Sequence, residues 1–144
     1  MDIQKYAGYF HDGSVHNIKH QGDIIYFSLE SAELLSEWKW DREKFPLSKR
    51  ESISGKLHVR LIKNIYYDAK PFHSLLKMIY ENGELFELNL REGKVQLLIK
   101  WKQYFPKKLQ TDIHNIEIEA EKIYWENIPT AYDALWDALD QKTD

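Results

Sequence analysis

Apolar and polar residues alternate along most of the chain. In the run 24–30 the apolar side chains of Ile25, Phe27 and Leu29 fall on one face of an extended strand. A period of two is typical of strands that bury one face and expose the other. The same alternation recurs in the runs 15–20, 55–61, 76–80, 86–90, 95–101 and 116–121. The pattern therefore predicts about seven strands, with Leu61 facing the core beside Leu57 and Val59.

Short turns join these runs. Gly22-Asp23, Asn82-Gly83 and Glu92-Gly93 each stand between two runs, and residues 68–72 contain Pro71. Asn-Gly is the strongest two-residue hairpin signal among them. Tight turns join antiparallel neighbours. The sequence thus predicts a mainly β fold, either an antiparallel sandwich or an open barrel. No linker or repeat divides it, so residues 1–144 are expected to form one domain.

Two parts of the chain interrupt the alternation. Residues 31–52 form the longest irregular stretch, and Ser31 is predicted to cap a helical turn at its start. From Thr130 to Leu139 the period changes to that of a helix, with Leu135 on its apolar face. Thr130 is a suitable N-cap. We therefore expect a short C-terminal amphipathic helix.

The composition excludes several kinds of functional site. The 144 residues include no cysteine, which excludes disulfides, thiolate nucleophiles and cysteine-ligated metals. The first nine residues contain no apolar run of signal-peptide length, and no segment approaches the roughly 20 apolar residues that cross a membrane. The expected location is the cytoplasm, without membrane contact.

Charge is unevenly distributed although the net charge is only −3. Residues 112–144 carry nine carboxylates and two lysines. These carboxylates either pair with basic residues across the fold or attract a partner. Trp38 and Trp40 lie where the alternation lapses, and tryptophan is a frequent interface anchor. The candidate binding residues are Trp38, Trp40, Glu117, Glu119, Glu121, Asp133 and Asp137.

The densest polar group lies near the N-terminus, at His11, Asp12 and His16. His16 and His20 are four positions apart, which in a strand means about 13 Å and is too far for one metal ion. We therefore predict no metal. The chain also lacks a Gly-x-Ser-x-Gly elbow and a glycine-rich phosphate loop. The sequence predicts no catalytic residue and no cofactor, and it indicates a candidate polar site at His11, Asp12 and His16.

A basic segment with interleaved aromatic residues covers residues 94–108. Such segments can bind single-stranded nucleic acid. The chain as a whole is acidic, and pairing of this segment with the glutamate stripe would explain its charge. Nucleic acid is therefore not an expected partner.

The opening Tyr9-Phe10-His11-Asp12-Gly13-Ser14, followed by alternating strands and Glu30-Ser31-Ala32-Glu33, resembles small bacterial β proteins similar to immunity proteins of bacterial toxin systems. The resemblance covers residues 9–33. It implies a cytoplasmic protein that binds and neutralises a toxin, and it implies no catalytic residues.

We therefore expect a non-enzymatic protein-interaction domain whose partner is another protein. It would use the acidic C-terminal region and the 31–47 loop. Two alternatives stay open: a β domain that binds a small molecule or carbohydrate, and a metal-dependent hydrolase that uses His11 and Asp12. The sequence does not determine the oligomeric state.

Overall fold

Seven strands form one antiparallel sheet in the computed structural model, which describes residues 3–34, 45–103 and 110–142. No helix within those ranges is long and apolar enough to span a membrane. The elements are η1 (Ile3–Phe10), β1 (Gly13–Gln21), β2 (Ile24–Glu30), β3 (Ser54–Tyr67), β4 (Lys70–Pro71), β5 (Asn82–Arg91), β6 (Lys94–Gln103), β7 (Gln110–Asn127) and α1 (Asp133–Lys142).

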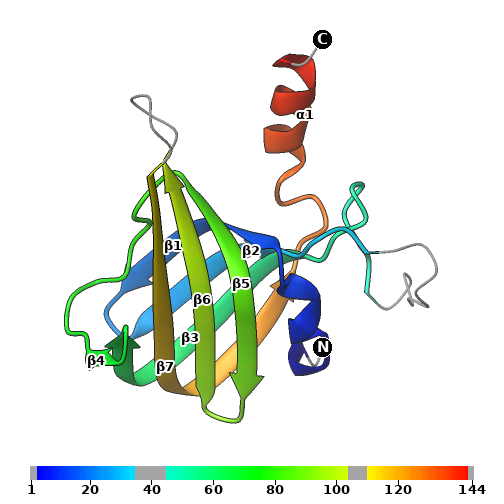
Figure 1. Cartoon of the computed structure of the whole chain (residues 1–144). Helices are drawn as coiled ribbons and strands as arrows, with labels where there is room; N and C mark the ends of the chain where they lie inside the picture. The colour runs from blue at the N-terminus through cyan, green and yellow to red at the C-terminus, as the bar shows by residue number, and fades with distance from the viewer. Residues whose placement is uncertain (1–2, 35–44, 104–109, 143–144) are drawn as a thin grey trace.

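The sheet closes into a six-stranded barrel. Its strand order is β2-β1-β5-β6-β7-β3-β4, and additional hydrogen bonds between β2 and β3 complete the ring, with β4 outside it. Figure 1 shows η1 beside β5 and α1 projecting from one end of the barrel. The predicted mainly β fold, its antiparallel pairing and its short C-terminal helix are confirmed.

The hydrogen-bonded seam between two neighbouring strands differs greatly in length from one pair of strands to the next. The pairing of β3 with β7 joins eleven pairs of residues. The pairing of β1 with β5 joins only three, from Gly13↔Leu85 to Val15↔Gly83. The β1–β5 seam is therefore the shortest link in the ring.

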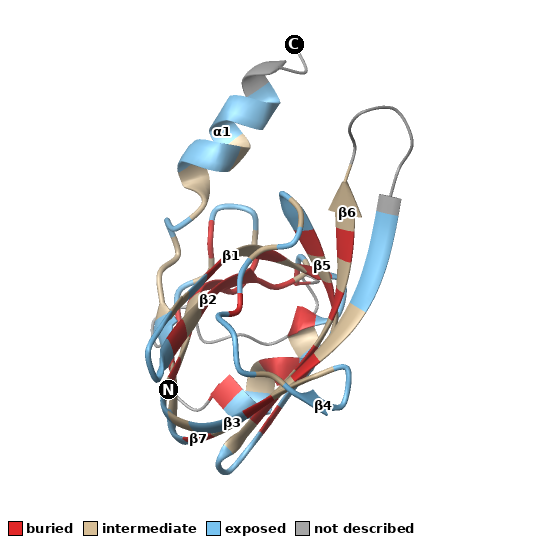
Figure 2. Cartoon of the chain, turned by 90° about the vertical axis from the view of Figure 1, so that its left-hand side faces the viewer, coloured by how far each residue is buried: buried red, intermediate tan, exposed pale blue. Residues whose placement is uncertain are grey.

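The core fills the inside of the barrel. Ile25, Phe27 and Leu29 are completely buried, as the alternation predicts. Val95, Leu97, Ile99 and Trp101 of β6 are completely buried as well. Buried residues appear in red along the strands in Figure 2, whereas α1 is mostly exposed.

A kink in β3 and β7 changes which residues face the core. Leu61 has a φ of 54° and is 50% exposed, so the prediction that it packs beside Leu57 and Val59 is wrong. The pairing register with β7 shifts just beyond it, between Ile62 and Asn64. A bulge bends a strand and re-aims its side chains. The kink thus divides the outer face of the barrel into two halves.

Asn82-Gly83 is not a hairpin turn, contrary to the prediction. Both residues lie in β5, and residues 76–80 form no strand. Gly83 pairs with Trp101, and a Cβ at position 83 would lie only 3.0 Å from the Trp101 ring. Glycine is needed here for this close approach, and not for a turn.

Two predicted caps are also wrong. Ser31 caps no helical turn: its N–H donates to the carbonyl of Ile53, and its hydroxyl accepts from the N–H of Ile53. The C-terminal helix begins at Asp133, three residues after Thr130. Residues 129–132 form a turn instead, and the N–H of Trp136 donates to the carbonyl of Tyr132.

A methyl group added at Gly83 tests the close packing on Trp101. Gly83→Ala should lower the free energy of unfolding by about 1–3 kcal/mol, because overpacking forces neighbours to shift. Urea denaturation measures this loss. Gly8→Ala is the matched control, since a Cβ added at position 8 would meet nothing within 4 Å. Equal stability of Gly83→Ala and the wild type would contradict the assignment.

Candidate functional site

The most constrained polar group in the described chain surrounds Glu30, at the end of β2. This carboxylate is only 4% exposed. His16 Nε2 lies 3.0 Å from its Oε1, Ser52 Oγ lies 2.6 Å from its Oε2, and Trp136 Nε1 donates to both oxygens at 3.0 and 3.3 Å. We call Glu30, His16, Ser52 and Trp136 the Glu30 cluster. It joins β1, β2, the loop before β3 and helix α1.

A bulge in β1 brings His16 into this cluster. The register between β1 and β2 shifts between Val15 and Asn17, so His16 has no partner opposite it. A bulged residue leaves the regular alternation of the strand. Gly13 allows the start of β1 to approach the end of β2 closely, since a Cβ there would lie 2.3 Å from the Glu30 carbonyl oxygen.

A tight loop positions Ser52. The N–H of Ser48 donates to the carbonyl of Ser52, and the N–H of Glu51 donates back to the carbonyl of Ser48. The Ser48 hydroxyl lies 2.7 Å from the Ser52 hydroxyl and accepts from the Ser52 N–H at 3.1 Å. These bonds direct the Ser52 hydroxyl toward the Glu30 carboxylate.

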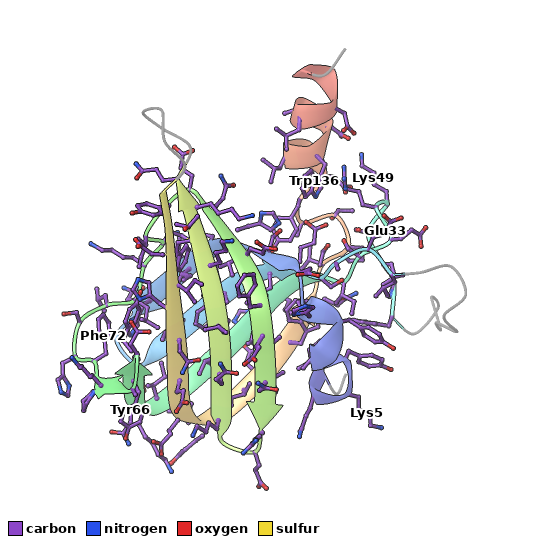
Figure 3. All side chains as sticks on the ribbon, viewed as in Figure 1. Lys5, Glu33, Lys49, Tyr66, Phe72 and Trp136 are labelled. Atoms are coloured by element: carbon purple, nitrogen blue, oxygen red, sulfur yellow. The ribbon has the colours of Figure 1, made fainter. Side chains whose placement is uncertain are left out.

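Helix α1 is attached to the barrel through its first turns. The guanidinium of Arg50 lies 4.1 Å above the Trp136 ring, and Lys49 Nζ lies 2.6 Å from Asp137 Oδ1. Trp136 and Lys49 appear together at the base of α1 in Figure 3. Just before the helix, the Tyr132 ring lies 4.0 Å from that of His16, and its hydroxyl donates to the Gly55 carbonyl.

Glu30 keeps its negative charge in this setting. Burial alone raises the pKa of Glu30, but hydrogen bonds from His16, Ser52 and Trp136 favour the charged form and bring the net pKa below its ordinary value of 4.5. Charge-assisted hydrogen bonds of this kind are stronger than neutral ones. The cluster is therefore an ionic anchor for α1.

The order of groups does not match a nucleophilic triad. In such a triad the base touches the nucleophile, and an acid orients the base. Here Glu30 lies between Ser52 and His16 and accepts from both. The geometry gives Ser52 a role in holding the carboxylate.

A groove of about 420 Å³ lies between α1 and the rim of the barrel. Leu135, Trp136 and Leu139 form its helical wall. Leu135 is 44% exposed and Leu139 is 42% exposed. The opposite wall comes from β1, β5 and β6 and includes Lys102, which forms a 2.9 Å ion pair with Glu84. The groove thus has one apolar wall and one polar wall.

The structure keeps His11 and Asp12 of the predicted polar site together, with His11 Nε2 3.6 Å from Asp12 Oδ1, and places His16 in the Glu30 cluster. Asp12 and His16 both line the groove, whereas His11 is exposed and its Nδ1 lies 2.5 Å from the carbonyl oxygen of Phe86 on β5. Across residues 3–34, 45–103 and 110–142, no three His, Asp or Glu side chains are grouped to hold a metal ion. Asp12 has a φ of 66° and lies in the turn between η1 and β1.

The glutamate stripe on β7 has neighbours of opposite charge. Glu117 pairs with Lys94 at 3.3 Å, and Glu121 pairs with Lys63 at 3.7 Å. Glu119 lies near Tyr66, whose pKa its charge raises. Cross-strand pairing therefore accounts for most of this stripe.

The remaining predicted binding residues differ in position. Asp133 and Asp137 lie in α1, and Asp137 pairs with Lys49. Trp38 and Trp40 lie outside the described residues, and so does most of the 31–47 loop. The alternative of a β domain that binds a small molecule or carbohydrate stays a prediction.

No protein-family model, curated protein or solved structure matches this chain. The resemblance to immunity proteins consequently has no independent support from these comparisons.

Removing the charge of Glu30 tests the anchor. Glu30→Gln should lower the free energy of unfolding by about 2–4 kcal/mol, because the amide turns one accepting oxygen into a donor that faces other donors. Glu33→Gln removes an exposed carboxylate nearby and should change little. Chemical denaturation compares the two variants. A loss no larger than that of Glu33→Gln would show that the carboxylate is not an anchor.

Acid should weaken the same anchor. Because the folded pKa of Glu30 is below its unfolded value of 4.5, its stabilising contribution is fully present above pH 4.5. It is lost as pH falls through the folded pKa. Unfolding measured from pH 6 down to about pH 3 should therefore show a steeper decline for the wild type than for Glu30→Gln. Parallel curves would contradict the lowered pKa.

Proposed function

We propose that this chain is a non-enzymatic protein-binding domain that presents α1 and the groove beside it to another protein. Toxin neutralisation, as in the immunity proteins that residues 9–33 resemble, is the form of this function that we favour. The observation that carries the proposal is a firmly anchored helix whose leucines are exposed.

Anchoring and exposure together set α1 apart from an ordinary surface helix. An amphipathic helix normally buries its apolar stripe, yet Leu135 and Leu139 stay about half exposed. A helix of ten residues is marginal by itself in water. The contacts of Trp136 with Glu30 and of Asp137 with Lys49 hold it in place. A pre-ordered helix loses little conformational entropy when a partner covers it.

The polar surroundings of the leucines suit a protein interface. Interfaces commonly have an apolar centre and a polar rim. Leu135 and Leu139 would form the centre, and the Glu84–Lys102 pair lies on the opposite wall of the groove. An interface of this kind needs no reacting group.

Charge favours a basic partner. Helix α1 carries three aspartates, Asp133, Asp137 and Asp140, against one lysine, Lys142, and its first turn is acidic. Lys49 and Arg50 balance part of this charge from outside the helix. Acidic side chains at the rim accelerate encounter with a positively charged surface. A basic, partly apolar protein, such as a basic toxin, is the partner that fits.

Two double variants of α1 test this function. Leu135→Ser with Leu139→Ser removes the exposed apolar surface, whereas Ala134→Ser with Ala138→Ser places the same hydroxyls elsewhere on the same helix. Tagged versions of both and of the wild type are used to recover partners from a lysate of the producing organism. Titration with the purified partner should show a loss of about tenfold or more for the leucine variant.

The variant Ala134→Ser with Ala138→Ser is the control for the loss of partner binding. The alanine variant should bind within about threefold of the wild type, as peripheral positions do. Circular dichroism should show unchanged helix content in both variants. A partner that binds the leucine variant as tightly as the wild type would exclude α1 as the interface.

A further inference from the structure

A second surface, which shares no residue with the groove beside α1, lies on the outside of β2, β3 and β7. Tyr26, His58 and Tyr124 are direct neighbours across these strands. Their ring centroids are 5.8 Å apart between Tyr26 and His58 and 4.6 Å apart between His58 and Tyr124. We call these three residues the aromatic row.

Cations surround the aromatic row. Lys56 Nζ lies 4.6 Å from the centre of the Tyr26 ring, and Arg60 and Lys122 lie 5.7 and 5.5 Å from that of Tyr124. No carboxylate in the described parts of the chain forms an ion pair with these three residues. Glu126 stands opposite Lys56 in the pairing of β3 with β7, and its carboxylate lies 2.8 Å from His58 Nε2 rather than in an ion pair with Lys56.

Arg60 and Lys122 stand directly opposite each other in the pairing of β3 with β7. Like charges in this position destabilise a sheet. Both cations also lie within 6 Å of the centre of the same ring, that of Tyr124. An anion placed between them would relieve the repulsion. The pair is therefore a point of attraction for a phosphate group.

An apolar groove of about 520 Å³ adjoins the aromatic row at Tyr26. Ile24 and Leu75, both exposed, form part of its lining. Lys19 and Lys77 also line it, and none of the described carboxylates does. Tyr26 thus belongs both to the groove and to the cationic surface.

We propose that this face binds single-stranded nucleic acid, with phosphates at Lys56, Arg60 and Lys122 and a base in the groove against Tyr26. Surfaces that bind single strands combine cations along the backbone path with aromatic and apolar platforms for the bases. A small inorganic anion would satisfy the cations but would leave the apolar groove without a matching group. A base with its phosphate supplies both.

The acidic net charge does not oppose this assignment. On β7 the glutamate stripe ends at Glu121, and the other half of the strand, residues 122–127, carries Lys122 and one carboxylate, Glu126. The kink lies between these halves, and the paired Lys63 and Lys94 belong to the acidic one. Binding of a polyanion depends on the local field that it meets.

The test measures binding of fluorescent 12-nucleotide oligo-dT and oligo-U by anisotropy. Arg60→Gln with Lys122→Gln should weaken binding about tenfold in low salt and should reduce the slope of log affinity against log salt by about 1.4, since each phosphate contact contributes about 0.7. Lys63→Gln with Lys94→Gln changes charge equally at paired lysines and should alter both quantities far less. Urea denaturation should show Arg60→Gln with Lys122→Gln to be no less stable than the wild type.

A second comparison tests how much the base contributes to binding. Tyr26→Leu keeps the cations and should weaken oligo-dT binding about tenfold. An abasic strand of equal length should bind the wild type as weakly as oligo-dT binds Tyr26→Leu.

Several results would overturn the proposal. One is the absence of saturable binding at protein concentrations up to about 100 µM, the weak end of non-specific affinities. Another is equal weakening in the two charge variants. Equal affinity for the abasic strand, or tighter binding to heparin or to phosphatidylserine vesicles than to oligo-dT, would show a general polyanion surface and exclude nucleic acid as its specific ligand.

Discussion

The buried charge of Glu30 organises one whole end of this barrel. Four separate parts of the chain meet there, where one carboxylate accepts hydrogen bonds from His16, Ser52 and Trp136. An unpaired charge at this depth would be strongly unfavourable. The folded state must therefore keep the loop before β3 and helix α1 in place together. The groove beside α1 depends on the same requirement.

The alternating pattern predicted the strands that have a regular inner face, such as β2 and β6. It failed where tertiary contacts override the local period. Leu61 faces away from the core because of the kink at its position. Glycine is needed at position 83 because the ring of Trp101 lies so close, and not because the chain turns there. The fold class was therefore predictable, and the exact set of strands was not.

The candidate site was largely hidden from sequence reasoning. In the alternation of β2, Glu30 takes an outward-facing position, where a charged residue is expected to face water. It is buried because Ser52 and Trp136, 22 and 106 positions away, cover it. The aromatic row is equally non-local, since Tyr26, His58 and Tyr124 come from three strands. No window along the chain contains either arrangement.

The short β1–β5 seam has a consequence for how the ring opens and closes. A closed barrel has no free edge, so it can separate only by breaking one of its seams, and three residue pairs are the fewest to break. The seam also joins residues about 70 positions apart, a contact whose loop-closure entropy is high. The ring is thus a curved sheet that is closed by its shortest seam. The start of β1, near the N-terminus, supplies one side of that seam.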